Sequence, residues 1–367
     1  MVRYRIVISA VNLVEGGPLT ILDNCLEAFS KLFQSNMNIE VIAIVNDKQK
    51  CLYPYIKYIE LKWPKQNWLN RIYCEYIYFY KLSKRLKPDF WFSLHDISPN
   101  VIARKRAVYC HNATPFYHPS IDKIRFSYKE YLFSKLYKYL YMINMKHNDL
   151  VVVQQDWIRN EFCKLFHLDM EQIIVAYPKI TLLQESKKHI ESGKCIFFYP
   201  SYPRTFKNFE LICEACMILN SRLVNDYEVV LTLIGDENRY AKDLYRKYGK
   251  LDNINFCGLL SYQEVCNLYE KTTCLIFPSK LETWGLPISE FAAYEKCMLV
   301  ADLPYAHETA SGANKVCFFD VGSPQELANK MEQVIKGNIN SFIPVPLHKL
   351  NEPAASSWSE LLMKLLK

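Results

Sequence analysis

Two glutamates, Glu282 and Glu290, flank a glycine-containing segment and are the residues of this sequence best suited to chemistry. The apolar run before Glu282 predicts a buried strand. Proline is favoured at the first position of a helix, so Pro287 predicts that a helix begins there. The backbone N–H groups of Gly285 and Leu286 would then suit a diphosphate or sugar hydroxyls. One carboxylate could contact a sugar while the other accepts hydrogen bonds from a ribose diol. The alternative is a solvated loop glutamate followed by a glutamate that only favours the helix dipole.

Two cations, Arg204 and Lys207, lie on one short loop between a predicted strand and a predicted helix. Such a pair would neutralise the charge that grows on a departing diphosphate, where electrostatic catalysis is most effective. They could equally be solvated loop charges, with Asn208 capping the helix that follows.

His111 ends a predicted strand and begins a turn-rich loop, a place where histidines often serve a site. A histidine that only bonds neighbouring backbone is the alternative. His95 and Asp96 end another predicted strand and are candidates for contacting or activating an acceptor hydroxyl. An aspartate in a strand-end turn also needs no catalytic role.

Short β-branched runs alternate with longer stretches of helical periodicity, which is typical of parallel α/β layers. The strands expected in the first half are 5–11, 39–45, 90–94, 108–111, 150–153 and 173–176. The helices expected there are 19–33, 68–86, 128–145 and 157–166. The strands expected in the second half are 195–199, 228–234, 254–257, 274–277, 298–301 and 316–318. The helices expected there are 209–220, 240–248, 262–269, 287–294, 324–335 and 357–367.

The pattern breaks at 179–194, which we interpret as a linker. It predicts an N-terminal acceptor-binding domain at 1–180, a nucleotide-sugar-binding domain at 194–345 and a C-terminal crossover segment at 346–367. Both domains would be Rossmann-like. Because ligands of open parallel sheets bind beyond the carboxyl ends of the strands, we expect the donor site in a cleft between the two domains.

The chain has 367 residues, half of them hydrophobic, and a formal net charge of +7. Its thirteen cysteines include one close pair, Cys213 and Cys216, in an apolar helical pattern, so no metal site or disulfide framework is indicated. The N-terminal apolar run is too short for a signal peptide, and no uncharged run is long enough to span a membrane. We therefore expect a cytoplasmic protein, either soluble or peripheral on the inner face of the membrane.

Residues 123–141 combine lysines and an arginine with many aromatic side chains. A solvated helix face is the simplest interpretation. An interfacial helix on anionic lipid is the second, since each cation near the surface contributes about 1 kcal/mol. Nucleic-acid binding is disfavoured because no recognition motif accompanies the charge.

Taken together, these segments resemble the retaining glycosyltransferases of family 4, which have the GT-B fold. The resemblance is carried by the spacing of Glu282 and Glu290 around Gly285-Leu286-Pro287, and by Lys207-Asn208 with Arg204, a variant used by some polysaccharide enzymes. It is specific over 195–336 and looser in the first half. The implied fold is α/β, with two facing Rossmann-like domains and a C-terminal helix crossing back to the first domain.

The resemblance implies roles in the second domain. Glu290 would hold the ribose hydroxyls and Glu282 those of the transferred sugar. Arg204 and Lys207 would bind the diphosphate, and the loop around Gly258 would border the nucleobase. The sequence departs from the family where Ser201-Tyr202 replaces the usual Gly-Arg of the phosphate loop.

In the first domain, the resemblance implies that Gly16 and Gly17 let a loop approach the diphosphate closely. His111 would reach the donor sugar from the acceptor side. The two cations and the helix dipole would replace a metal, and no cofactor is expected besides the donor substrate.

The implied function is retaining transfer of a hexose or deoxyhexose from a nucleoside diphosphate sugar to a glycan acceptor in O-antigen or capsule assembly, and we expect this acceptor to be lipid-linked. A sugar-nucleotide epimerase of the same fold would act on the donor without an acceptor. A phosphorylase would need a lysine that holds pyridoxal phosphate. A two-domain sugar-binding protein is disfavoured, because proteins of that class are usually exported and the N-terminal apolar run is too short for a signal peptide.

Overall fold

The computed structural model describes residues 4–35, 38–117, 124–126, 128–179 and 193–367. The chain forms two compact units, each built on a parallel β-sheet. Unit 1 comprises Met1–Phe116, Ser134–Lys179 and Leu350–Lys367, and unit 2 comprises Tyr117–Phe133 and Ile180–Lys349. The predicted α/β fold class with two Rossmann-like domains is therefore confirmed.

The described strands of unit 1 form one parallel sheet in the order β14-β7-β6-β5-β4-β1-β2-β3. Successive side chains of a strand point to opposite faces, so Ile6 and Ile8 enter one core while Val7 enters the other. The strand bounds are β1 Tyr4–Ala10, β2 Ile39–Val45, β3 Ile56–Glu60, β4 Phe90–Ser93, β5 Lys105–Cys110, β6 Leu150–Val153, β7 Ile173–Ala176 and β14 Ala354–Ala355.

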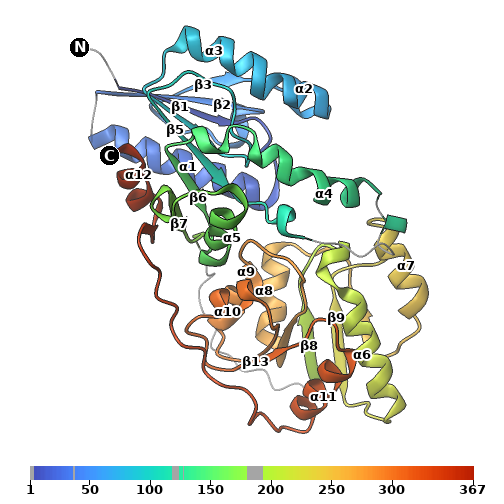
Figure 1. Cartoon of the computed structure of the whole chain (residues 1–367). Coiled ribbons are helices and arrows are strands. Elements are labelled where there is room, and N and C mark those ends of the chain that lie inside the picture. Colours follow the sequence, from blue (N-terminus) through green and yellow to red (C-terminus); the bar gives the residue numbers. More distant parts are fainter. Residues whose placement is uncertain (1–3, 36–37, 118–123, 127, 180–192) are drawn as a thin grey trace. The chain divides into compact units, whose positions relative to one another are not determined.

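Helices cover both faces of this sheet (Figure 1). Leu22 and Phe29 of α1 and Leu361 of α12 lie in the core that contains Ile6, whereas Phe79 and Leu82 of α3 lie in the other. The helix bounds are α1 Gly16–Ser35, α2 Trp68–Tyr73, α3 Phe79–Leu86, α4 Tyr128–Met142, α5 Asp156–Phe166 and α12 Trp358–Leu366, and a π-helical turn, Cys74–Tyr78, joins α2 to α3.

The chain returns to unit 1 after unit 2, as predicted. β14 pairs with β7, and the Trp358 ring stacks on Tyr109 with 5.7 Å between the ring centroids. Arg159 of α5 donates a hydrogen bond to the carbonyl oxygen of Asn351 at 2.9 Å. These contacts tie the C-terminal segment to the first sheet.

The described strands of unit 2 form a second parallel sheet in the order β10-β9-β8-β11-β12-β13. Their bounds are β8 Cys195–Tyr199, β9 Tyr227–Leu231, β10 Ile254–Phe256, β11 Cys274–Phe277, β12 Cys297–Ala301 and β13 Val316–Phe319. The helix bounds are α6 Phe209–Ser221, α7 Arg239–Tyr248, α8 Tyr262–Lys271, α9 Leu286–Ala292, α10 Pro304–Thr309 and α11 Pro324–Ile335. In this order β8 and β11 are neighbours, which brings together the loops that follow them.

The units differ from the predicted domains mainly in one segment, because Tyr117–Phe133 belongs to unit 2 and not to the first domain. The physical reason is aromatic and ionic packing. Phe126 meets the Tyr240 ring edge-on at 5.4 Å, Tyr117 meets Phe206 at 5.8 Å, and Arg125 lies 3.9 Å from Asp243. Amino-acid composition alone does not indicate that this segment belongs to unit 2.

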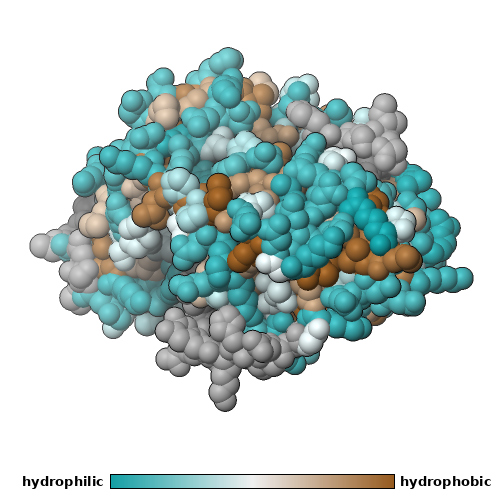
Figure 2. Space-filling view, turned by 90° about the horizontal axis from the view of Figure 1, so that it is seen from below, coloured by the Kyte–Doolittle hydropathy of each residue, from teal (hydrophilic) through white to brown (hydrophobic). Residues whose placement is uncertain are grey.

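Figure 2 shows one face of the molecule, on which hydrophilic side chains predominate and hydrophobic ones lie in patches between them. No helix among the described residues is long and apolar enough to cross a membrane. The described residues also contain no group of His, Cys, Asp and Glu side chains that could hold a metal ion.

Candidate functional site

Lys207 and Glu282 meet in unit 2, at the carboxyl ends of the adjacent strands β8 and β11. The Lys207 Nζ lies 2.5 Å from Glu282 Oε1, and both side chains are largely shielded from solvent. Lys207 ends a short 3₁₀ turn, Thr205–Lys207, while Glu282 lies in the loop between β11 and α9. The structure thus brings together one of the two predicted phosphate-binding cations and the predicted sugar-binding carboxylate.

Backbone and amide contacts fix the two loops to each other. The Lys280 N–H donates to the Phe206 carbonyl oxygen at 2.8 Å, and the Asn208 side chain donates to the Pro278 carbonyl oxygen at 3.3 Å. Asn208 is buried with a left-handed φ of 59°. Asparagine tolerates this conformation, which turns the chain from the 3₁₀ turn into α6. The two loops that carry the ion pair are therefore hydrogen-bonded to each other.

Glu290 lies on α9, and its Oε2 accepts a hydrogen bond from the buried Tyr269 hydroxyl of α8 at 3.0 Å. Burial raises the pKa of Glu290, and the Tyr269 hydrogen bond acts in the opposite direction. Gly285 starts this helix with a φ of +91°, a backbone conformation that only glycine adopts readily. Sequence reasoning missed Tyr269, because no local pattern links it to Glu290.

Arg204, the second predicted cation, faces another part of unit 2. Its guanidinium lies 5.8 Å from the centroid of the Tyr202 ring. It lines a pocket of about 360 Å³ together with Tyr202, Asn238, Tyr240 and other residues. Asn238 and Tyr240 belong to the connection and helix that follow β9, whereas Glu282 follows β11. In this structure the two cations of the loop therefore have different neighbours.

Three predicted glycines have different local settings. Gly258 has a φ of +78° and follows β10, the edge strand, so two strands separate it from β11. Gly16 has a φ of +60° and begins α1. A Cβ at Gly16 or Gly17 would meet no atom within 4 Å, so packing inside unit 1 does not require glycine at either position.

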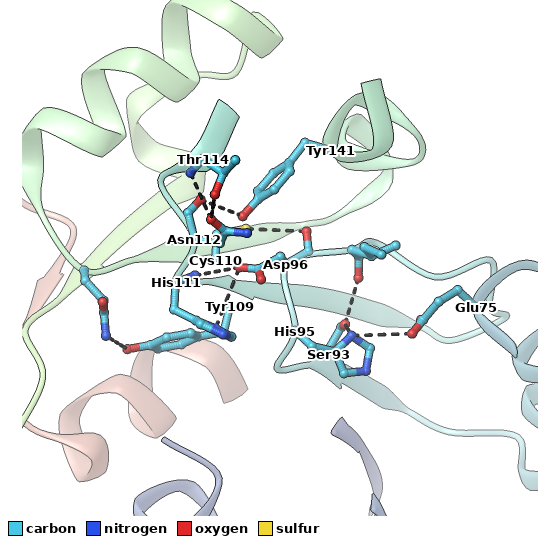
Figure 3. A network of polar contacts seen from close by, with 12 residues as sticks. Glu75, Ser93, His95, Asp96, Tyr109, Cys110, His111, Asn112, Thr114 and Tyr141 are labelled. Atoms are coloured by element: carbon cyan, nitrogen blue, oxygen red, sulfur yellow. Dashed lines mark hydrogen bonds and ion pairs between the residues drawn. The ribbon is translucent and has the colours of Figure 1, made fainter. Parts of the chain in front are cut away.

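His111 lies in unit 1 at the carboxyl end of β5, where Asp96 holds its loop (Figure 3). The His111 backbone N–H donates to Asp96 Oδ1 at 2.7 Å, and its ring Nδ1 lies 3.7 Å from the same oxygen. The next residue, Asn112, accepts a hydrogen bond at its carbonyl oxygen from the Tyr141 hydroxyl at 3.0 Å. Asp96 thus has a clear structural task in shaping this loop.

His95 is only 3% exposed, so its ring cannot contact an acceptor in this conformation. Its Nδ1 lies 2.7 Å from an Arg71 nitrogen and 3.5 Å from a Glu75 oxygen. Sequence reasoning missed both partners, although their spacing of four residues within a helical pattern permits an ion pair.

Comparisons with known proteins bear on both units. The sequence model of the family described as "Glycosyl transferases group 1" matches residues 180–344. The O-antigen chain mannosyltransferase RfbU of Salmonella typhimurium is 25% identical over 270 residues, which cover 71% of this chain and 70% of RfbU.

Solved structures match the fold over 92% of this chain. The lipopolysaccharide outer core galactosyltransferase WaaB, in its apo form, is 16% identical with a TM-score of 0.61, over 92% of this chain and 91% of WaaB. Anabaena HepE, in complex with UDP and glucose, is 14% identical with a TM-score of 0.59, over 92% of each chain. Residues 180–344 are thus similar to group 1 glycosyl transferases, and the two units together have the GT-B fold.

Proposed function

We propose that this glycosyltransferase retains the anomeric configuration while it moves a hexose or deoxyhexose from a nucleoside diphosphate sugar to a glycan acceptor. The observation that carries the proposal is the Lys207–Glu282 pair, held at 2.5 Å beside the loop that leads to Glu290. The similarity to an O-antigen mannosyltransferase and to an outer core galactosyltransferase supports a role in O-antigen or capsule assembly. Binding of UDP and glucose by HepE supports the donor class.

Lys207 would stabilise the leaving diphosphate. An ammonium group has three N–H donors, so Lys207 can keep its bond to Glu282 and still donate to phosphate oxygens. A cation already in place costs no reorganisation when negative charge develops on the leaving group. Glu282 has a second carboxylate oxygen for hydroxyls of the transferred sugar. The acceptor would then attack on the face that the diphosphate leaves, which gives retention.

Glu290 would accept hydrogen bonds from the ribose hydroxyls, while Tyr269 holds its carboxylate. Arg204 would reach the same diphosphate only after its side chain turns from the pocket it lines. In unit 1, we assign donor contacts to His111 and to the Gly16-Gly17 loop. In this proposal, protein side chains and backbone groups supply all the contacts to the donor, without a cofactor or a metal ion.

A donor panel tests this function. Nucleoside diphosphate sugars are scored by thermal shift and by turnover with a polyprenyl-diphosphate-linked glycan, and NMR reports the configuration of the product. Stabilisation by one donor together with acceptor-dependent transfer and retention is expected. Conversion of the donor without acceptor would favour the epimerase, and binding of free sugar without any nucleotide would favour a sugar-binding protein.

A lipid-linked acceptor would bring the enzyme to the inner face of the cytoplasmic membrane, and unit 1 has a surface suited to lipid. We call it the α2–α4 face. The Trp68 ring of α2 meets Tyr137 of α4 at 6.5 Å, which places the two helices side by side. Large apolar side chains of α2, the π-helical turn and α4 are at least 40% exposed, namely Trp68, Leu69, Ile72, Tyr73, Ile77, Leu136, Tyr139 and Met142.

Lysines lie on α4 and on α3, the helix that follows the π-helical turn. Lys81 and Lys84 continue the helix that carries Ile77, and Lys135 and Lys138 lie on α4. Apolar side chains with flanking lysines suit the interface of an anionic membrane. Of the predicted basic aromatic stretch, residues 123 and 127 lie outside the described part of the chain. The surface we propose also includes α2 and the π-helical turn, which lie outside that predicted stretch.

Binding to vesicles tests the α2–α4 face. We expect co-sedimentation with phosphatidylglycerol vesicles to weaken at least tenfold in the double variant Lys135→Glu/Lys138→Glu, because each reversed cation loses about 1 kcal/mol of attraction and adds repulsion. Leu69→Asp should weaken binding as well. The control is Leu223→Asp, since Leu223 of unit 2 is 84% exposed and Leu69 is 80% exposed. If both α2–α4 variants bound the vesicles as well as the wild type does, the α2–α4 face would be a solvated surface and not a membrane contact.

A further inference from the structure

Three ionisable side chains are buried together in unit 1. Arg71 is 3% exposed, Glu75 is fully buried and His95 is 3% exposed. The Arg71 Nε lies 2.7 Å from Glu75 Oε1, and an Arg71 Nη lies 2.7 Å from the His95 Nδ1. Arg71 comes from α2, Glu75 from the π-helical turn and His95 from the segment after β4. We call these three residues the buried cluster.

Stability does not explain the buried cluster. Removing charges from water is costly, and apolar replacements of a buried ion pair are often neutral or stabilising. The His95 Nε2 is buried and has no hydrogen-bond partner among the residues that the structure describes. The π-helical turn, which carries Glu75, departs from regular helix, and such turns are frequent at functional sites. Both features point to a role other than folding.

The protonation pattern of the cluster follows from its geometry. Arginine only donates hydrogen bonds, so the His95 Nδ1 accepts one from Arg71, and a neutral ring then carries its proton on Nε2. Burial, with the charge of Arg71, lowers the pKa of His95 well below its usual value. Burial also raises the pKa of Glu75 to about 7, against the effect of Arg71. Arg71 is therefore the fixed charge of the cluster.

The backbone of His95 leads directly into the turn that holds His111. Its carbonyl oxygen accepts a hydrogen bond from the Ile97 N–H at 2.7 Å. Asp96, between them, has a φ of +67°, which is unfavourable for a residue with a Cβ. In Figure 3 the Glu75–His95 contact lies on one side of Asp96, and His111 and Asn112 lie on the other. A displaced His95 ring would let this turn relax.

We propose that Arg71, Glu75 and His95 are positioning residues, which hold the strained Asp96 turn and through it His111. None of the three touches substrate. The inference rests on the proposed function, in which His111 contacts the transferred sugar. A loss of alignment of about 1 Å can lower a rate about a hundredfold, so small shifts of His111 would matter.

The test replaces the whole cluster with apolar residues of similar size, in the variant Arg71→Met/Glu75→Leu/His95→Leu. We expect its melting temperature to equal or exceed that of the wild type, because no buried charge remains unpaired. We expect kcat to fall about 10- to 100-fold, with the donor KM within threefold of wild type. The NMR signals of the His111 ring should shift, since this readout reports the turn directly.

A matched control removes another buried ion pair of unit 1. Arg159 and Asp156 form such a pair on α5, and Arg159 also donates to the carbonyl oxygens of Asn351 and Pro353. The variant Asp156→Leu/Arg159→Met removes both of these Arg159 hydrogen bonds, although the Pro353 carbonyl oxygen still accepts one from the Val175 N–H. It should therefore lose thermal stability, yet it should keep its kcat within twofold and leave the His111 signals in place.

A single substitution keeps the test decisive if the triple variant does not fold. In His95→Gln, the amide oxygen can accept the Arg71 hydrogen bond, so more turnover should remain than in His95→Leu. Wild-type kcat and unshifted His111 signals in the triple variant, or equal losses in His95→Gln and His95→Leu, would overturn the inference. If the wild type transfers no sugar, the proposed function fails, whereas shifted His111 signals still support the positioning role.

Discussion

Replacing Lys207 with alanine is expected to lower kcat 100- to 1,000-fold while the protein stays folded. The Nζ of Lys207 lies 2.5 Å from Glu282 Oε1, in the loop between β11 and α9. Loss of a single preorganised group that stabilises developing charge typically has an effect of this size. Steady-state kinetics with the donor found in the panel measures it, and the donor KM should change much less than kcat.

A second ion pair of unit 2 provides the matched control. Arg222, the residue after α6, lies 2.6 Å from Glu332 of α11, and its side chain is 31% exposed. Arg222→Ala also breaks a short ion pair, but far from the carboxyl ends of β8 and β11. Its turnover should stay within twofold of wild type. A Lys207→Ala enzyme with wild-type turnover would contradict the assignment of Lys207 to the leaving diphosphate.

Glu282→Gln separates two explanations of a Lys207 effect. If Lys207 only neutralises Glu282, removal of the carboxylate charge should restore activity to the Lys207→Ala variant. If Lys207 acts on the diphosphate, the double variant should be no more active than either single variant. The coupling of the two substitutions, obtained from the four kcat values, decides between these explanations.

The alternation of apolar runs predicted most strands and helices to within a few residues, because each buried strand or amphipathic helix has a strong local pattern. Besides the short 3₁₀ turns and the two-residue strand β14, two elements were missed. β3 reads Ile-Lys-Tyr-Ile-Glu, lies at the sheet edge and is only partly buried, so its sequence alternates weakly. α10 has six residues, too few for a helical period to stand out. The helix predicted at 68–86 is continuous except for the π-helical turn.

The site shows where local patterns stop being informative. Lys207 and Glu282 could be predicted as neighbours, because the loops that follow adjacent parallel strands lie at one sheet edge. The direction of the Arg204 side chain could not be predicted, since it depends on Tyr202 and on packing with the helix after β9. The burial of His95 beside Arg71 could not either, because a helix and a strand distant in sequence create it. Residue types reveal candidates, whereas tertiary packing decides which of them can reach a ligand.

Replacing Glu290 with glutamine is expected to weaken binding of the nucleoside diphosphate about 10- to 100-fold. Hydrogen bonds to a charged group contribute about 1.5–3 kcal/mol, and each 1.4 kcal/mol corresponds to a factor of ten. Titration calorimetry with the nucleoside diphosphate of the preferred donor measures the loss. Glu290→Ala should have at least as large an effect. The control is Glu295→Gln, which removes an exposed carboxylate five residues further along and should leave affinity within twofold.

Removal of a ribose hydroxyl from the ligand tests which contact Glu290 makes. The wild type should bind the 2′-deoxy or the 3′-deoxy nucleoside diphosphate more weakly than the parent compound. Glu290→Gln should show a much smaller difference, because the charged acceptor of that hydroxyl is already absent. Tyr269→Phe removes the hydrogen bond that holds the Glu290 carboxylate, so it should give an intermediate loss. A deoxy penalty of the same size in wild type and Glu290→Gln would mean that another residue holds the ribose.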